Sequence, residues 1–155
     1  MRNKIIFLSL LFISLLNIPT AYAIQDAYGN PISWEGKIKV VNYWAEWCAP
    51  CRHEIPAFNQ LAKELEEKQI LVVGINYDNL NNKSLIRTME NLDIQFPVLD
   101  SDSLNELHLP QPAVLPTTYI LNADGEIVTS LVGPQTQQSI NNTLQKLQLA
   151  STPAA

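Results

Sequence analysis

The sequence predicts one α/β domain, built on a central mixed β-sheet that is flanked by helices. Two apolar runs, residues 37–44 and 70–76, enclose a helical pattern over residues 48–68, and this strand–helix–strand order requires a parallel crossover. Two later runs, residues 117–121 and 126–132, are joined by a short turn and predict an antiparallel hairpin. A sheet that contains both kinds of pairing is mixed.

The first residues have the pattern of a secretory signal peptide. Arg2 and Lys4 give a positive start, residues 5–16 form an apolar run, and Ala21-Tyr22-Ala23 is a small-x-small cleavage signal. An uncleaved membrane anchor is the alternative, although the run is short for a span of about 20 residues. The expected division of the chain is a signal peptide, a folded domain and a flexible tail, at residues 1–23, 24–149 and 150–155.

The charge of the chain excludes one class of partner. The sequence has 10 Lys and Arg against 15 Asp and Glu, a net charge of −5, and removal of residues 1–23 would take away two of the basic residues. An acidic protein without a basic patch is a poor binder of nucleic acid. We therefore expect no nucleic-acid partner.

The helical pattern over residues 48–68 has an apolar face at helical spacing. Its apolar residues are Ile55, Phe58, Leu61, Ala62 and Leu65. The strand before it is continuously apolar, which indicates burial on both faces of the sheet. We expect residues 37–44 to form the central strand, with this helix packed against it.

Shorter signals lie between the second strand and the hairpin. We expect a helix over residues 82–92, a short strand over residues 96–99 and a helical turn over residues 103–107. Residues 108–115 carry two prolines and predict an irregular loop. A closing helix is expected over residues 136–148. Its inward residues are Ile140, Leu144 and Leu147.

The only two cysteines, Cys48 and Cys51, form a Cys-x-x-Cys pair where the central strand meets the long helix. The reactive species of such a pair is a thiolate. Unpaired N–H groups and aligned peptide dipoles at a helix N-terminus lower a thiol pKa. Pro50 fits the first helical turn, where a missing N–H matters little. We expect Cys48 to be the exposed nucleophile and Cys51 the resolving cysteine, acting through a mixed disulfide.

Two other interpretations of the cysteine pair stay open. A structural disulfide would close so small a loop that it constrains the unfolded chain little. A tetrahedral zinc site needs four ligands, and the chain has only two histidines, His53 and His108. The local pattern favours a redox dithiol, and we predict no metal site.

The stretch WAEWCAPC around the cysteines resembles the active site of the thioredoxin superfamily. Asn42, the continuation RHEIP, and the stretch LPTTYILNADG over residues 115–125 are similar to its periplasmic TlpA/ResA branch of thiol–disulfide reductases. The resemblance covers residues 36–147. It implies a thioredoxin-like fold with an N-terminal hairpin in residues 24–36 and a β-α insertion in residues 77–107.

Glu54 lies three residues after Cys51, on the same face of the predicted helix. That face points at the buried thiol, so Glu54 would be partly buried, with a raised pKa, and would relay protons to and from Cys51. The resemblance implies a functional glutamate at this position, and a solvated carboxylate is the other interpretation. Asn42 stands where thioredoxin has a buried aspartate. An amide cannot accept a proton at neutral pH, so proton transfer would fall to Glu54 or water. Because Asn42 matches the TlpA/ResA branch, the resemblance implies a structural role for it.

Pro116 resembles the cis-proline of the superfamily, which lies opposite the nucleophile. The resemblance implies that the backbone of Leu115 pairs with a substrate peptide like an added strand. Trp47 precedes the nucleophile, and we expect it to be half exposed as a surface for partner contact. The expected substrate-binding residues are Trp47, Ala49, Pro50, Leu115, Pro116 and Thr117.

Together the motifs predict a periplasmic thiol–disulfide oxidoreductase that acts as a reductase. No cofactor is expected beyond the Cys48–Cys51 disulfide. The resemblance implies a membrane thiol–disulfide electron donor and, as substrates, disulfides in exported proteins, with the haem-binding CxxCH of apocytochrome c as one candidate. We expect a monomer. The alternatives are a disulfide oxidase or isomerase, and a Cu(I) metallochaperone on the same fold.

Overall fold

The computed structural model describes the backbone of residues 23–150 and the side chains of residues 23–147. The predicted signal peptide, residues 1–23, therefore lies outside the described residues except for Ala23, and so do residues 151–155 of the predicted tail. Among the helices within residues 23–150, none combines the length and the apolar character that a membrane crossing requires.

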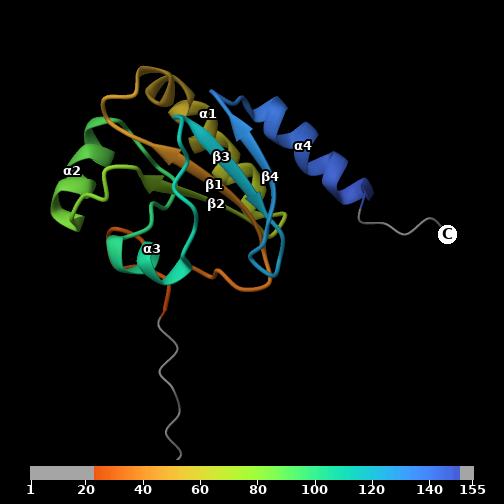
Figure 1. The fold of residues 1–155 in the computed structure, drawn as a ribbon, viewed down its shortest axis with the longest axis horizontal. Coiled ribbons are helices and arrows are strands. Elements are labelled where there is room, and N and C mark those ends of the chain that lie inside the picture. Colours follow the sequence, from red (N-terminus) through yellow and green to blue (C-terminus); the bar gives the residue numbers. More distant parts are fainter. Residues whose placement is uncertain (1–22, 151–155) are drawn as a thin grey trace, which may run out of the picture.

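A four-stranded sheet in the order β2-β1-β3-β4 forms the centre of the domain (Figure 1). β1 (Ile38–Trp44) and β2 (Ile70–Asn76) are parallel, with Val40 opposite Val72. β3 (Thr117–Leu121) is antiparallel both to β1 and to β4 (Ile127–Val132). The predicted mixed sheet, with its parallel crossover and its hairpin, is confirmed.

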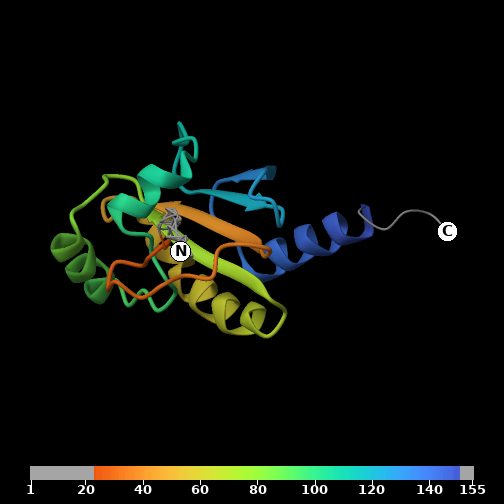
Figure 2. The same ribbon diagram turned by 90° about the horizontal axis from the view of Figure 1, so that it is seen from below.

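β1 is the central strand because both of its faces are covered. All of its residues after Ile38 are buried, and alternate side chains enter two separate apolar clusters. Val40 and Trp44 belong to the cluster that includes the long helix, whereas Val41 and Tyr43 belong to the cluster on the other face. α1 (Ala49–Glu66) and α3 (Ser101–Leu107) lie on opposite sides of the sheet in Figure 2.

α1 begins directly after the first cysteine. Cys48 is its N-cap residue, with an extended backbone, and Pro50 lies in the first turn as predicted. The helix continues through Pro56 and ends at Glu66, two residues before the predicted end. Its buried apolar residues lie at the predicted positions; they are Ile55, Phe58, Leu61 and Leu65.

The segment after β2 contains α2 (Asn82–Asn91) and α3, in agreement with the predicted helix and helical turn. We predicted a short strand over residues 96–99, and this prediction was wrong, because no regular strand forms there. Val98 and Leu99 make only isolated bridges, to Gly74 and to Asp26. The physical reason is Pro97, whose nitrogen carries no hydrogen to donate to a ladder. Its carbonyl still accepts a hydrogen bond from the Gly74 backbone at 2.8 Å.

The lead-in before β1 contains a tight antiparallel turn. Gln25 and Pro31 form one isolated bridge, and Gly29 at its tip has φ +82°, which glycine adopts without strain. The expected N-terminal hairpin is therefore reduced to this single bridge. Asp26 closes it by accepting the backbone N–H of Asn30 at 2.8 Å.

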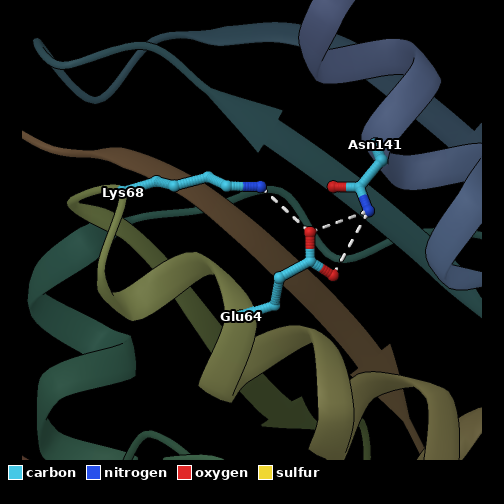
Figure 3. Close-up of polar contacts among 3 residues, drawn as sticks. All are labelled: Glu64, Lys68 and Asn141. Atoms are coloured by element: carbon cyan, nitrogen blue, oxygen red, sulfur yellow. Dashed lines mark hydrogen bonds and ion pairs between the residues drawn. The ribbon is translucent and has the colours of Figure 1, made fainter.

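α4 (Gln137–Ala150) closes the domain beside α1, and the predicted inward residues Ile140 and Leu144 are buried. A polar contact joins the two helices at the surface (Figure 3). The carboxylate of Glu64 accepts hydrogen bonds from Lys68 at 2.9 Å and from Asn141 of α4 at 3.3 Å. Because these groups are exposed to solvent, we assign most of the packing free energy to the apolar residues beneath them.

Candidate active site

The two cysteines form a disulfide at the junction of β1 and α1, with their Cα atoms 5.3 Å apart. The residue Cys48 is 5% exposed and Cys51 is 1% exposed. The cysteine predicted to be the nucleophile is thus the more accessible of the two, although its exposed fraction is small. The backbone N–H of Cys51 donates to the sulfur of Cys48 at 3.3 Å.

This placement gives Cys48 the chemistry of an activated thiol. Cys48 is the N-cap residue, so its sulfur faces the first N–H groups of α1, which lack partners within the helix. Once the disulfide is reduced, these N–H groups and the helix dipole stabilise a thiolate at Cys48. Cys51 lies one turn further, within the core, where burial favours the neutral thiol.

Glu54 lies three residues after Cys51 in α1, among the buried residues of the helix, and is only 3% exposed. Its two carboxylate oxygens accept one hydrogen bond each, at 2.7 Å, from the Asn42 side chain and from the backbone N–H of Gln135. Both hydrogen bonds favour the charged form. Burial outweighs them and raises the pKa of Glu54 to about 7. Glu54 can therefore gain or lose a proton near neutral pH.

Asn42 has the structural role that the resemblance implied. It lies on β1 opposite Thr118 of β3, and its amide nitrogen donates both to Glu54 and to the Thr118 hydroxyl, the latter at 3.2 Å. The side chain is 2% exposed. Asn42 therefore fixes the Glu54 carboxylate without competing with it for protons.

Trp47 is 65% exposed, more than the half-exposed surface that we expected. Its ring packs edge-on against Tyr77 at 6.2 Å, and its indole N–H donates to the Asp78 carboxylate at 3.0 Å. These contacts hold a broad apolar surface next to Cys48. Ala49 and Pro50, between the cysteines, are also exposed.

The Leu115–Pro116 peptide bond is cis, as the resemblance implied. Pro116 directly precedes β3. Because the first residue of β3, Thr117, pairs with Tyr43 near the end of β1, Pro116 lies at the carboxyl end of the central strand. Leu115 is half-buried, whereas Thr117 is fully buried and its hydroxyl donates to the Val114 carbonyl at 2.8 Å. A substrate contact in this segment would therefore involve Leu115 rather than the Thr117 side chain.

Two contributions to the site were absent from the sequence reasoning. The Gln135 contact uses a backbone N–H, which every residue except proline has, so no residue type marks it. Tyr77 and Asp78, which hold Trp47, follow directly after β2. The sequence did contain a signal for them. β2 is parallel to the active-site strand, and polar residues that follow such a strand lie near the site.

The two histidines do not join the cysteines. His53 and His108 are both exposed, and His108 ends α3 with a left-handed backbone. Within residues 23–147, no cluster of three His, Cys, Asp or Glu side chains is arranged to hold a metal ion. The redox group that the structure contains is the Cys48–Cys51 disulfide.

Comparison with known proteins places this site in a family. The sequence pattern of the AhpC/TSA family matches residues 19–130. The chain is 36% identical to the thioredoxin-like protein YneN of Bacillus subtilis over 130 residues, which are 82% of this chain and 69% of that protein. It is 26% identical to the thiol–disulfide oxidoreductase ResA of Bacillus cereus over 129 residues, 81% of this chain and 74% of ResA.

A solved structure agrees with these sequence matches. The crystal structure of a thiol:disulfide interchange protein of the thioredoxin family, from Chlorobium tepidum, superposes with a TM-score of 0.63. The match has 26% identity and covers 81% of this chain and 91% of that one. The chain therefore belongs to the AhpC/TSA family, and it is a thiol–disulfide oxidoreductase with a thioredoxin-like fold.

Proposed function

We propose that the protein works in the periplasm as a reductase of disulfides in exported proteins. The signal-peptide pattern at the N-terminus supports export, and the uncharged Ala49 and Pro50 between the cysteines support a reducing dithiol. The observation that carries the proposal is the buried carboxyl of Glu54, with a pKa of about 7, on the same helix face as Cys51.

The reaction needs two sulfur attacks and one proton acceptor. The Cys48 thiolate attacks one sulfur of a substrate disulfide, and the substrate's other sulfur leaves as a thiolate. Cys51 then loses its proton to the Glu54 carboxylate and attacks the Cys48 sulfur. This step forms the Cys48–Cys51 disulfide and releases the second substrate thiolate, so that two electrons pass to the substrate.

Each turnover leaves the dithiol oxidised, so a reductant has to restore it. In an oxidising compartment that reductant must be a dedicated one. We propose a membrane thiol–disulfide carrier, which would reduce Cys48–Cys51 by the same exchange in reverse. The protein would act as a monomer, because one chain contains both cysteines and Glu54.

The reduction potential of Cys48–Cys51 tests the direction of exchange. Equilibration against thiol buffers should give a value near that of thioredoxin, about −270 mV. A value near that of a strong oxidant, about −120 mV, would overturn the reductase and make the protein a disulfide donor.

Trapping in cells tests the substrate class. In Cys51→Ser the mixed disulfide on Cys48 cannot resolve, so exported proteins with cysteine pairs should accumulate as adducts. The matched control Cys48→Ser should trap none. Apocytochrome c is the substrate that the proposal puts first, and cells lacking the protein should then contain less holocytochrome c. A normal level of holocytochrome c would rule out apocytochrome c as a substrate, but it would not contradict the reductase function.

A further inference from the structure

The segment between β4 and the first turn of α4 supplies one of the two partners of the Glu54 carboxylate. It covers residues 133–139, and we call it the α4 cap. Its contact with Glu54 is the backbone N–H of Gln135, which donates to one carboxylate oxygen at 2.7 Å. The direction of a backbone N–H depends on the conformation of the chain around it. The contacts that hold the α4 cap therefore decide whether Glu54 keeps this partner.

The α4 cap is anchored at both of its ends. At its start, the backbone N–H of Gly133 donates to the Pro116 carbonyl at 2.9 Å. At its end, the Thr136 backbone N–H donates to the Ser139 hydroxyl at 2.9 Å, and the Ser139 backbone N–H donates to the Thr136 hydroxyl at 3.1 Å. This reciprocal pair resembles the capping box of a helix N-terminus. The α4 cap is thus fixed both to the cis-proline segment and to α4.

The side chain of Gln135 links the two anchors. Its amide nitrogen donates to the Gly133 carbonyl at 2.8 Å, and its amide oxygen accepts from the Ser139 hydroxyl at 2.9 Å. The Ser139 hydroxyl has one hydrogen, which it shares with the Thr136 carbonyl, also at 2.9 Å. Both ends of the Gln135 amide are therefore used within the α4 cap, where they hold the backbone of the same residue in place.

The Gln135 N–H acts on the charge state of Glu54. Burial raises the pKa of Glu54, and the Gln135 N–H is the larger of the two hydrogen bonds that oppose this rise. The Asn42 amide provides the smaller one. Hydrogen bonds to the charged form of a carboxyl favour that form. The position of the α4 cap therefore helps to set the pH at which Glu54 becomes a carboxylate.

No charged side chain competes with this effect in the described part of the chain. The titratable groups on the first two turns of α1 that are buried with Glu54 are the two cysteines, whereas Arg52 and His53 are exposed. The titratable residues of β1 and β3 belong to the other face of the sheet; they are Lys39, Tyr43 and Tyr119. Between residues 133 and 147 the one charged residue is Lys146, near the far end of α4.

We propose that Gln135 and Ser139 are positioning residues of the thiol–disulfide exchange, which hold the Gln135 N–H on Glu54 so that Glu54 is a carboxylate when Cys51 gives up its proton. This inference rests on the proposed role of Glu54 and adds the residues that tune it. If the N–H moves away, the charged form of Glu54 loses a partner. Glu54 then keeps its own proton at neutral pH and cannot take up that of Cys51.

Carbon-13 NMR of the oxidised protein tests the inference directly, because the cysteines do not titrate while they form the disulfide. The side-chain carboxyls of glutamate are labelled, and the signal missing in Glu54→Gln identifies Glu54. The wild-type midpoint should lie near pH 7. In Gln135→Ala we expect it to rise by about 0.5–1 pH unit, because the N–H is loosened rather than removed. An unchanged or lower midpoint would overturn the inference.

A second pair of variants and a control locate the effect in the α4 cap. Ser139→Ala removes the hydroxyl that holds Gln135 and should also raise the midpoint, whereas Ser139→Thr keeps the hydroxyl and should retain the wild-type value. The matched control is Gln138→Ala, at an exposed glutamine of the same helical turn, and its midpoint should stay at the wild-type value. An equal shift in Gln138→Ala would indicate a general loosening of α4 and would contradict the inference.

The dependence of the reaction on pH distinguishes positioning from damage to the fold. In a single-turnover oxidation of the reduced protein by a peptide disulfide, Gln135→Ala should be about two- to five-fold slower than wild type at pH 7. At pH 9 the two rates should be equal, because Glu54 is a carboxylate in both proteins. A rate lowered by the same factor at every pH would indicate structural damage and would also overturn the inference.

The same measurements separate the two proposals. If the wild-type protein has no inflection near pH 7 in either experiment, the proposed proton transfer to Glu54 fails, and this inference fails with it. If the wild type has the inflection and Gln135→Ala leaves it in place, only the inference about the α4 cap fails.

Discussion

Two neighbouring residues of β1, Asn42 and Tyr43, face opposite sides of the sheet, and their buried polar atoms differ in character. On the α1 side, Asn42, Glu54, Thr118 and the Gln135 backbone form a network in which both carboxylate oxygens of Glu54 have partners. On the other side, the Tyr43 hydroxyl is buried and has no partner among the described residues. The paired network holds a proton for the chemistry of the dithiol, whereas the Tyr43 hydroxyl makes no hydrogen bond within the described part of the domain.

The α1 side also contains a buried donor without a partner. Trp44 Nε1 makes no hydrogen bond in the described part of the chain. It lies against Gly74, among Phe96 and Val98, where a single added Cβ would already approach it to 3.0 Å. The Tyr43 hydroxyl is likewise buried away from solvent. The two unpaired donors therefore lie within the packed interior, on opposite faces of the sheet.

The largest effect is expected from removing the proton acceptor of the paired network. Glu54→Gln keeps the size of the side chain but cannot accept the Cys51 proton, so release of the substrate should slow by about 10²-fold at pH 8. In stopped-flow oxidation of the reduced protein by a peptide disulfide, the wild-type rate should rise with pH around 7. The variant should lack that inflection.

A surface carboxylate of the same helix provides the control for this experiment. Glu66→Gln lies on the exposed side of α1 and should keep both the rate and its dependence on pH. If Glu54→Gln were as fast as Glu66→Gln, the paired network would be structural only, and the difference between the two sides of β1 would be one of packing.

Stability against pH reports on the same carboxyl independently of catalysis. The folded state holds the Glu54 proton up to about pH 7, whereas the unfolded state releases it near 4.5. The Glu54 contribution to stability is therefore fully present below about pH 4.5 and is lost as the pH rises through 7. The shift corresponds to about 3 kcal/mol.

Urea unfolding of wild type and Glu54→Gln between pH 4 and pH 8.5 measures this contribution as a difference. The free energy of unfolding of the wild type should fall relative to that of the variant as the pH rises. Parallel curves would mean that Glu54 titrates at an ordinary pKa, and the proton relay would lose its basis.

The side chains of the dithiol site were accessible to sequence reasoning, whereas the contacts on the opposite face of the sheet were not, for a physical reason. Cys48, Cys51 and Glu54 recur every third residue, so helical periodicity alone places them on one face. On the opposite face, Tyr43 of β1 lies beside residues of the α3 segment, which are far from it in sequence. Their approach depends on how the insertion packs, and local periodicity carries no information about that.

The same distinction accounts for the one strand that was wrong. Residues 96–99 have the apolar character of a strand, and Phe96 and Val98 are indeed buried. Apolar pattern predicted their burial correctly, but it does not report on hydrogen bonding. Pro97, which removes a donor from the middle of the run, decided that no ladder forms.

The packing of the α1 side is tested at Gly74, which pairs with Asn42 in the sheet. In Gly74→Ala the new Cβ would lie 2.8 Å from a ring carbon of Phe96 and 3.1 Å from Val98. These side chains would have to move, so the free energy of unfolding should fall by about 1–3 kcal/mol. Thermal unfolding measures this loss. An unchanged midpoint temperature would show that the packing on this side can accommodate an added methyl group.

The smallest effect is expected at Tyr43, and its sign distinguishes the two sides of the sheet. Tyr43→Phe removes a buried hydroxyl that lacks a partner among the described residues, so no hydrogen bond within the domain is lost. We expect the free energy of unfolding to stay the same or rise by up to about 1 kcal/mol. A loss of 1 kcal/mol or more in urea unfolding would show that the hydroxyl is already bonded in the free protein. The Tyr43 side would then resemble the paired side, with its buried polar group satisfied.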